Sequence, residues 1–114
     1  MSKKLAFLDK TFWITETEAN PKHVASLQLL KKPAGCDRDY VDKLLAEMRA
    51  FDQATAPFNC RVKTVMGYPI KFVPVEKLDM QYHVQLHNID DLNDKTALHK
   101  FVASLHEPWL DRDK

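Results

Sequence analysis

The sequence predicts one soluble unit of the α+β class, on three observations. Helical and strand periodicities follow one another in the order helix, strand, helix, strands, helix. The 114 residues, of which 45% are hydrophobic and 29% charged, are enough for a single core without disulfides or a metal. No segment approaches the ~20 apolar residues that span a bilayer. The start is basic, but the apolar stretch behind it is interrupted by Asp9 and Lys10, too early for the apolar region of a signal peptide.

The first elements are a helix and a strand. Apolar residues recur every three or four positions over residues 5–12, which predicts a short opening helix. Residues 23–30 alternate apolar with polar side chains, which predicts a half-buried strand. The Lys, Pro and Gly residues at 31–35 are typical of a turn and should end that strand.

A second helix and a pair of strands are predicted next. We expect Asp39 to cap this helix at its N-terminus. Its apolar stripe consists of Val41, Leu44, Leu45, Met48 and Phe51. Pro57 marks the exit, and residues 61–66 and 70–75 read as short strands on either side of a turn at Gly67-Tyr68-Pro69.

The last elements are a strand and a helix. Residues 80–86 alternate apolar with polar side chains and predict a strand with one buried face. Residues 88–93 are polar and predict a turn. The final helix is stopped by Pro108, and its apolar stripe consists of Leu98, Phe101, Val102 and Leu105.

Composition excludes several classes of protein. With 17 Lys and Arg against 16 Asp and Glu, the net charge of +1 gives no field that would attract nucleic acid. The two glycines, Gly35 and Gly67, cannot form a Gly-rich phosphate loop. The two cysteines, Cys36 and Cys60, lie far apart and outside any CxxC pattern, which indicates reduced thiols in a cytoplasmic protein.

Five histidines are candidates for acid-base or metal chemistry: His23, His83, His87, His99 and His106. His83 and His87 have the i, i+4 spacing of a metal-binding helix, but the glutamate of HExxH is missing and the local period is two. We interpret them as two residues on the polar face of a strand and predict no metal site. An enzyme that uses His83 or His87 directly remains an alternative. His99 and His106 are expected to be solvated or to lie at a helix end.

Other reactive side chains have simpler interpretations. Cys60 adjoins Arg61, which would favour a thiolate, but no base is placed to activate it, so we predict an inert buried cysteine. A calcium loop is excluded because its glycine and its alternating ligands are missing. Three carboxylates instead complement the N-terminus of the last helix: Asp90, Asp91 and Asp94. The two tryptophans are expected in a core or an interface.

Several short motifs follow one another along nearly the whole chain. They are Leu8-Asp9-Lys10-Thr11-Phe12, Glu16, Asn20-Pro21-Lys22-His23-Val24, Pro57-Phe58, Arg61, Met80-Gln81-Tyr82-His83-Val84, Leu105-His106 and Leu110-Asp111-Arg112. In this order and spacing, the chain resembles the N-terminal portion of the bacterial wax ester synthase/acyl-CoA:diacylglycerol acyltransferase family. The resemblance implies a chloramphenicol-acetyltransferase-like fold of two α/β domains with the active site in a channel between them. Residues 1–114 would be a partial N-terminal acyltransferase domain.

The resemblance also implies an activity, the transfer of a fatty acyl group from acyl-CoA to a long-chain alcohol or a diacylglycerol. The family's signature is HHxxxDG, in which the second histidine acts as general base. This chain has no two adjacent histidines, so no catalytic residue can be assigned to it. The signature normally follows Pro-Leu-Trp, which comes after Leu-Asp-Arg, and we expect it beyond Lys114. Residues 1–114 alone should be inactive.

The positions that match the family pattern are assigned packing or orientation roles. These family-pattern positions are Asp9, Phe12, His23, Val24, Pro57, Arg61, His83, Val84, Asp111 and Arg112. The expected partners are the remainder of the polypeptide, acyl-CoA as cosubstrate, and a fatty alcohol or diacylglycerol, with no nucleic acid and no bound cofactor. The expected location is the cytoplasm, with peripheral contact at the inner membrane or lipid inclusions. The alternative from another class is a self-contained, non-catalytic α+β binding or interaction module.

Overall fold

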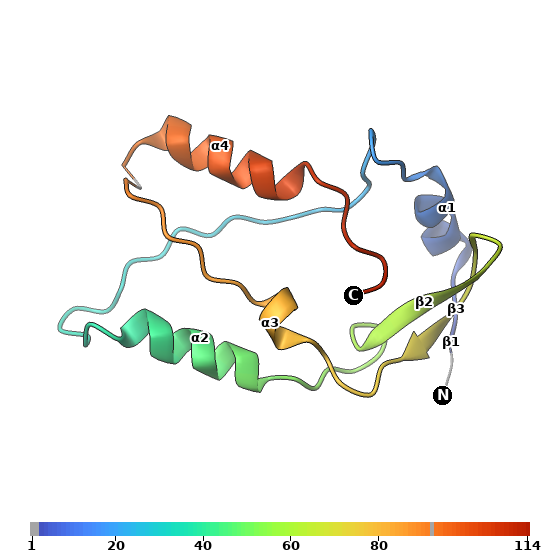
Figure 1. The fold of residues 1–114 in the computed structure, drawn as a ribbon, viewed down its shortest axis with the longest axis horizontal. Coiled ribbons are helices and arrows are strands. Elements are labelled where there is room, and N and C mark those ends of the chain that lie inside the picture. Colours follow the sequence, from blue (N-terminus) through green and yellow to red (C-terminus); the bar gives the residue numbers. More distant parts are fainter. Residues whose placement is uncertain (1–2, 92) are drawn as a thin grey trace.

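The computed structural model describes residues 3–91 and 93–114. Its elements are, in order, β1 (Lys3–Lys4), α1 (Phe7–Thr15), α2 (Tyr40–Ala50), β2 (Cys60–Val65), β3 (Tyr68–Pro74), α3 (Met80–His83) and α4 (Lys95–His106). Figure 1 shows α1 and the strands at one end and α2 and α4 at the other. The combination of helices with a small antiparallel sheet agrees with the predicted α+β class.

The sheet has the strand order β1-β3-β2, and both pairings are antiparallel. The β2–β3 hairpin turns at Met66 and Gly67, whose φ angles are 51° and 80°. Positive φ at both central residues is the geometry of a type I′ turn, which matches the twist of the flanking strands. The predicted turn position is therefore wrong by about one residue, because Tyr68 already pairs with Val65 and Pro69 pairs with Thr64.

Helix α1 packs against β3 and confirms the predicted opening helix. The backbone N–H of Ala6 donates to the carboxylate of Asp9 at 3.3 Å, which fixes the first turn. Leu5, which joins β1 to α1, is buried, and Pro69 of β3 is almost completely enclosed. Together these contacts form a small core at the sheet end of the molecule.

The two longer helices confirm their predictions but are capped differently. The carboxylate of Asp94 accepts the amide of Ala97 at 3.1 Å and caps α4 as a carboxylate at that position should. Asp39 does precede α2, but its side chain makes no capping bond. It lies instead 3.3 Å from the ammonium of Lys43, one turn into the helix.

The two strands predicted from alternation alone are both wrong. Residues 23–30 have no regular secondary structure and cross the molecule as an extended segment between α1 and α2 (Figure 1). Residues 80–86 instead begin with α3, where the carboxylate of Asp79 accepts the amide of Tyr82 at 3.3 Å and stabilises a helical turn. A strand is stabilised by a hydrogen-bonded neighbour, and no described strand pairs with either segment. The turn predicted over residues 88–93 includes Leu92, which lies outside the described residues.

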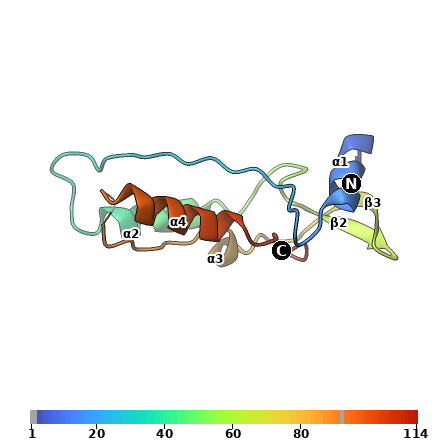
Figure 2. The ribbon, with the colours of Figure 1, turned by 90° about the horizontal axis from the view of Figure 1, so that it is seen from above.

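The chain is thin and expanded. It measures 51 × 31 × 18 Å with a radius of gyration of 17.5 Å, whereas a compact domain of this length has about 13 Å. Its accessible surface is 9919 Å², about one and a half times the value for a compact protein of this mass. Among the described residues, the buried side chains are Leu5, Pro69 and Leu98. The prediction of a single self-sufficient core is therefore wrong, and Figure 2 shows the reason, since the elements lie in a flat, open layer.

Candidate functional site

The most highly connected group of polar side chains lies where the C-terminal segment returns to α1. We call it the Arg112 cluster, and its members are Trp13, Glu16, His23, His106, Trp109 and Arg112. It joins the end of α1, the loop after it, the end of α4 and the C-terminal segment, which are separated by up to 99 residues in sequence. Two of its members, His23 and Arg112, are family-pattern positions.

The guanidinium of Arg112 is held both by hydrogen bonds and by aromatic rings. Its Nη2 donates to the carbonyl oxygen of Trp13 at 3.0 Å and to Glu16 Oε1 at 3.1 Å. Its Cζ lies 4.0 Å from the ring centroid of Trp13 and 4.8 Å from that of Trp109. A planar, weakly hydrated cation is suited to such a site, because it can stack on a ring and donate in its own plane at the same time.

The carboxylate of Glu16 is the anion of this cluster and is mostly buried, with 13% of its side chain exposed. Burial raises the pKa of Glu16, but this is outweighed by the hydrogen bond from the Lys22 amide, the hydrogen bond and charge of Arg112, and the charge of His23. Together these partners lower the pKa of Glu16 below its ordinary value. Glu16 is therefore held as an anion in a partly dry site.

His23 connects this ion pair to α4. Its Nε2 lies 2.7 Å from the carbonyl oxygen of His106, and the two imidazole rings lie 4.5 Å apart. A carbonyl oxygen only accepts, so Nε2 of His23 carries a proton. Nδ1 of the same ring is buried and has no hydrogen-bond partner. The structure thus gives His23 a linking position between the loop after α1 and the last residue of α4.

A cavity of about 290 Å³ lies beside the Arg112 cluster, between α1 and the sheet. Its lining is largely apolar but includes charged and imidazole groups along one side. The lining residues are Leu5, Asp9, Phe12, Trp13, Glu16, Lys22, His23, Val62 and Phe72. The family-pattern positions Asp9, Phe12 and His23 therefore meet around one cavity, although they span two separate motifs of the sequence.

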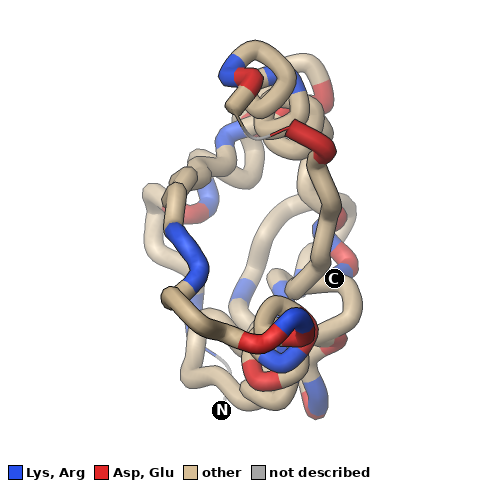
Figure 3. Tube along the Cα trace, turned by 90° about the vertical axis from the view of Figure 1, so that its left-hand side faces the viewer, with Lys and Arg blue, Asp and Glu red and all other residues tan. Residues whose placement is uncertain are grey.

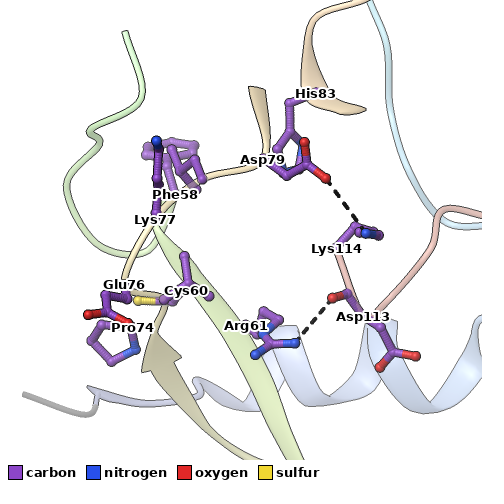
Figure 4. Close-up of a pocket in the computed structure, with 12 residues that line it drawn as sticks. Phe58, Cys60, Arg61, Pro74, Glu76, Lys77, Asp79, His83, Asp113 and Lys114 are labelled. Carbon is purple, nitrogen blue, oxygen red and sulfur yellow. Dashed lines mark hydrogen bonds and ion pairs between the residues drawn. The ribbon is translucent and has the colours of Figure 1, made fainter. Parts of the chain in front are cut away.

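A second and larger cavity of about 510 Å³ lies between the hairpin, α3 and the C-terminal residues (Figure 4). Two family-pattern positions, Arg61 and His83, lie on its wall. Arg61 Nη1 donates to the carbonyl oxygen of Asp113 at 3.2 Å, and Lys114 Nζ lies 3.6 Å from the carboxylate of Asp79. These two contacts fasten the C-terminal residues across the cavity.

Cys60 and His83 share this cavity but do not form a nucleophile and base pair. The thiol of Cys60 donates to Asn59 Oδ1 at 3.3 Å. Figure 4 shows its sulfur directed toward Glu76 and Pro74, whereas His83 lies beside Asp79. Cys60 is half-buried rather than fully buried as predicted. The partner of the thiol is thus the side-chain amide of Asn59 and not the imidazole of His83.

The remaining family-pattern positions are dispersed. Val24 is 95% exposed, and the carbonyl oxygen of Val84 accepts from Arg49 Nε at 3.0 Å. Asp111 accepts the amide of Asp113 at 2.9 Å. Pro57 follows a cis peptide bond after Ala56. None of these four contributes a side chain to the Arg112 cluster as defined above.

The other histidines are not gathered into a site. His83 ends α3 and His87 lies in the segment after it, so their i, i+4 spacing does not correspond to one helix face. His87 Nε2 lies 3.3 Å from Gln85 Oε1, and its ring meets the edge of Phe101. His99 is exposed on α4. Across residues 3–91 and 93–114, no three His, Cys, Asp or Glu side chains are close enough to hold a metal ion.

Four members of the Arg112 cluster are not among the site positions predicted from the sequence, namely Trp13, Glu16, His106 and Trp109. A signal was present, since each tryptophan lies three residues before a charged partner, Glu16 or Arg112. Spacing within each segment does not reveal that the two segments meet. The sequence predicts that the tryptophans lie in a core or an interface, but Trp13 is half-buried and Trp109 is 38% exposed, so neither lies in a buried core.

Charges are mixed over the surface. In Figure 3, basic and acidic residues occur side by side on the same stretches of chain and form no continuous stripe of one sign. Within the described residues, no helix has the length and apolar character needed to cross a membrane.

Comparison with known proteins supports the resemblance found in the sequence. A family model described as the wax ester synthase/diacylglycerol acyltransferase catalytic domain matches residues 5–114. No curated protein and no solved structure matches the chain. The matched span includes every family-pattern position and both ends of the Arg112 cluster. The chain therefore belongs to the wax ester synthase/diacylglycerol acyltransferase catalytic-domain family.

Proposed function

We propose that the chain is the N-terminal portion of an O-acyltransferase that moves a fatty acyl group from acyl-CoA to a long-chain alcohol or a diacylglycerol. The observation that carries this proposal is the family match over residues 5–114. In the reaction, the alcohol oxygen attacks the thioester carbonyl carbon, the C–S bond breaks and CoA leaves as its thiol. The alcohol proton passes to a general base, which then returns it to the departing sulfur of CoA.

The proposal places that base outside these 114 residues. The family's HHxxxDG signature requires two adjacent histidines, and the sequence has none. The cavities beside α1 and beside α3 contain no pair of a nucleophile and a base that would replace it. Residues 1–114 would then supply part of a first domain, and part of the channel wall, in a chloramphenicol-acetyltransferase-like enzyme of two domains.

The open structure supports a role within a larger protein. Many large apolar side chains are exposed, including Leu29 at 71%, Leu30 at 87% and Phe51 at 77%. Soluble proteins rarely leave this much apolar surface uncovered, since water contact with it is unfavourable. Residues 23–30 are extended and belong to no sheet of the described chain, as expected of a segment that pairs with a strand supplied by further polypeptide. Lipid substrates also favour contact with a membrane or a lipid inclusion.

An assay of CoA release tests the proposed function. The full-length protein should release free CoA thiol from a long-chain acyl-CoA only when a fatty alcohol or a diacylglycerol is supplied. Residues 1–114 alone should release none. Full-length protein that releases no CoA with either acceptor would support the alternative of a non-catalytic module. Turnover by residues 1–114 alone would restore His83 and His87 as candidate catalytic residues.

The coding sequence provides a second, independent test. We expect Pro-Leu-Trp and then HHxxxDG within a few tens of residues after Lys114. Their absence would contradict the acyltransferase assignment even if some CoA were released, because no general base of the family would then be present.

A further inference from the structure

We propose that Glu16 and Arg112 form a positioning pair that fixes the segment after α4 against α1 for the acyl-transfer reaction. The inference rests on the proposed function and extends it to residues that the family signature does not include. Neither residue touches the reacting atoms in this proposal. Their role is to hold two parts of the chain, almost a hundred positions apart, in one geometry.

The burial of the pair is the first argument. Only 13% of the Glu16 side chain and 25% of the Arg112 side chain are exposed, and their N–O distance is 3.1 Å. The other ion pairs found here are much more exposed, for example Lys43 with Asp39 at 62% and 54%. Burying two charges has a large desolvation cost, and apolar residues often stabilise a fold equally well. This partly buried pair is therefore better explained by the specific geometry that it imposes.

The orientation that its contacts impose on the Arg112 guanidinium is the second argument. Arg112 donates to the carbonyl oxygen of Trp13 as well as to Glu16, and it is stacked between the rings of Trp13 and Trp109. These contacts fix the plane of the guanidinium as well as its position. Lysine could supply the charge, but it has neither the planar donor arrangement nor the stacking surface. Both hydrogen bonds come from Nη2, and among the described residues Nε is buried without a partner, so the contact with the two indole rings is what favours arginine over lysine here.

The connection to His23 is the third argument. The Glu16 carboxylate accepts the amide of Lys22, the residue before His23, at 2.8 Å. His23 in turn bonds the carbonyl oxygen of His106 at the end of α4. The end of α4 and the segment containing Arg112 are therefore both tied to the same short stretch around Glu16. The chain that follows α4 would therefore start from a fixed position and direction beside Glu16. A positioning role requires this.

Conservative variants of the full-length protein test the proposal. We would compare Arg112→Lys, Glu16→Gln and the double variant with wild type, and use Arg38→Lys, at an exposed position, as the matched control. The measurements are kcat and KM for acyl-CoA and for the alcohol, normalised to the folded fraction by circular dichroism. The emission of Trp13 and Trp109 is an internal probe, because both rings lie against the Arg112 guanidinium; it is the part of the full-length protein's emission that is lost when both are replaced by phenylalanine.

We expect Arg112→Lys to lower kcat by about 10- to 100-fold, since small displacements of a catalytic assembly have effects of this size. KM should stay within about twofold because substrate contacts are retained. The double variant should be no slower than the worse single variant, because both changes break one contact. Arg112→Lys should also shift the tryptophan emission, while Arg38→Lys should change neither property.

Several results would overturn the inference. If the wild type is active and both single variants keep kcat within about twofold, the pair has no positioning role and the proposed function stands. Fully additive losses in the double variant would show that Glu16 and Arg112 act separately. An inactive wild-type protein would overturn the proposed function, and this inference with it.

Discussion

The two ends of the molecule are built differently. At the sheet end, the three strands share backbone hydrogen bonds, α1 packs on β3, and the Arg112 side chain ties the C-terminal segment to α1. At the other end, the apolar stripe of α2 is largely exposed, and α3 is the element on which α2 packs within the described residues. In α4, Leu98 is buried and Leu105 is exposed. Residues 23–30 run between the ends without joining either a sheet or a helix.

This difference shows which elements find their packing or pairing partners within the chain. The two strands of the hairpin are joined by a two-residue turn and pair locally, whereas β1 and α1 contact β3 from more than fifty residues away along the chain. The stripe of α2 and the extended segment need partners that the described chain does not supply. Local stability should therefore differ between the ends, with the lowest values in elements that have few packed neighbours.

The largest difference is expected in hydrogen exchange. In residues 1–114 alone, the amides of residues 24–30 should exchange about as fast as those of an unfolded peptide. The amides of β3 should exchange at least about 100-fold more slowly. Mass spectrometry of the exchanging protein measures both. In the longer polypeptide, residues 24–30 should become protected. Equal protection of residues 24–30 in the two samples would contradict the view that this segment lacks a partner within residues 1–114.

Truncation of a large apolar side chain should distinguish the ends by stability. Trp13→Ala removes the ring nearest to the Arg112 guanidinium and part of the wall of the α1 cavity. We expect it to lower the free energy of unfolding by about 2 to 3 kcal/mol. Met48→Ala, on the exposed stripe of α2, should change it by less than about 0.5 kcal/mol. Urea unfolding measures both, and similar losses would indicate one cooperative core instead of two unequal ends.

The same substitution, glycine to alanine at a positive φ angle, can be made at each end of the molecule. Gly67 has a φ of +80° in the hairpin and Gly35 a φ of +74° before α2, and neither has an atom within 4 Å of an added Cβ. Gly67→Ala should cost about 1 kcal/mol, because alanine is strained at positive φ and the paired strands hold the turn in place. Gly35→Ala should cost less, because the exposed segment around it can relax. A larger thermal shift for Gly35→Ala would contradict this order.

The smallest expected effect is a pH dependence at Glu16. Its pKa is lowered in the folded protein, so its contribution to stability is fully present above the ordinary glutamate pKa of about 4.3 and is lost as the pH falls through the lowered value. Glu16→Gln should therefore flatten the loss of stability on acidification. Urea unfolding between neutral pH and about pH 3 measures the pH dependence of the free energy of unfolding. Glu47→Gln, on α2, is the control. Parallel slopes for wild type and Glu16→Gln would contradict the assignment.

Local patterns predicted α1, α2, α4 and the hairpin, because each is stabilised mainly by contacts within a few residues. Asp94 at the start of α4 and Gly67 in the hairpin turn are examples in which one residue type satisfies a local backbone requirement. The same patterns were wrong for residues 23–30 and 80–86. Alternation indicates which face a strand would bury, but a strand also requires a neighbour, and alternation contains no information about its presence.

The motifs also predicted the family, because their order and spacing along the chain are themselves sequence properties. Only the tertiary structure showed that the ends of those motifs meet. Trp13 and Glu16 reach Trp109 and Arg112 across more than ninety residues, and His23 reaches the end of α4. The sequence thus determined the local elements and the family, whereas the fold decided the Arg112 cluster, because an ion pair between segments far apart in the chain depends on packing that no short pattern encodes.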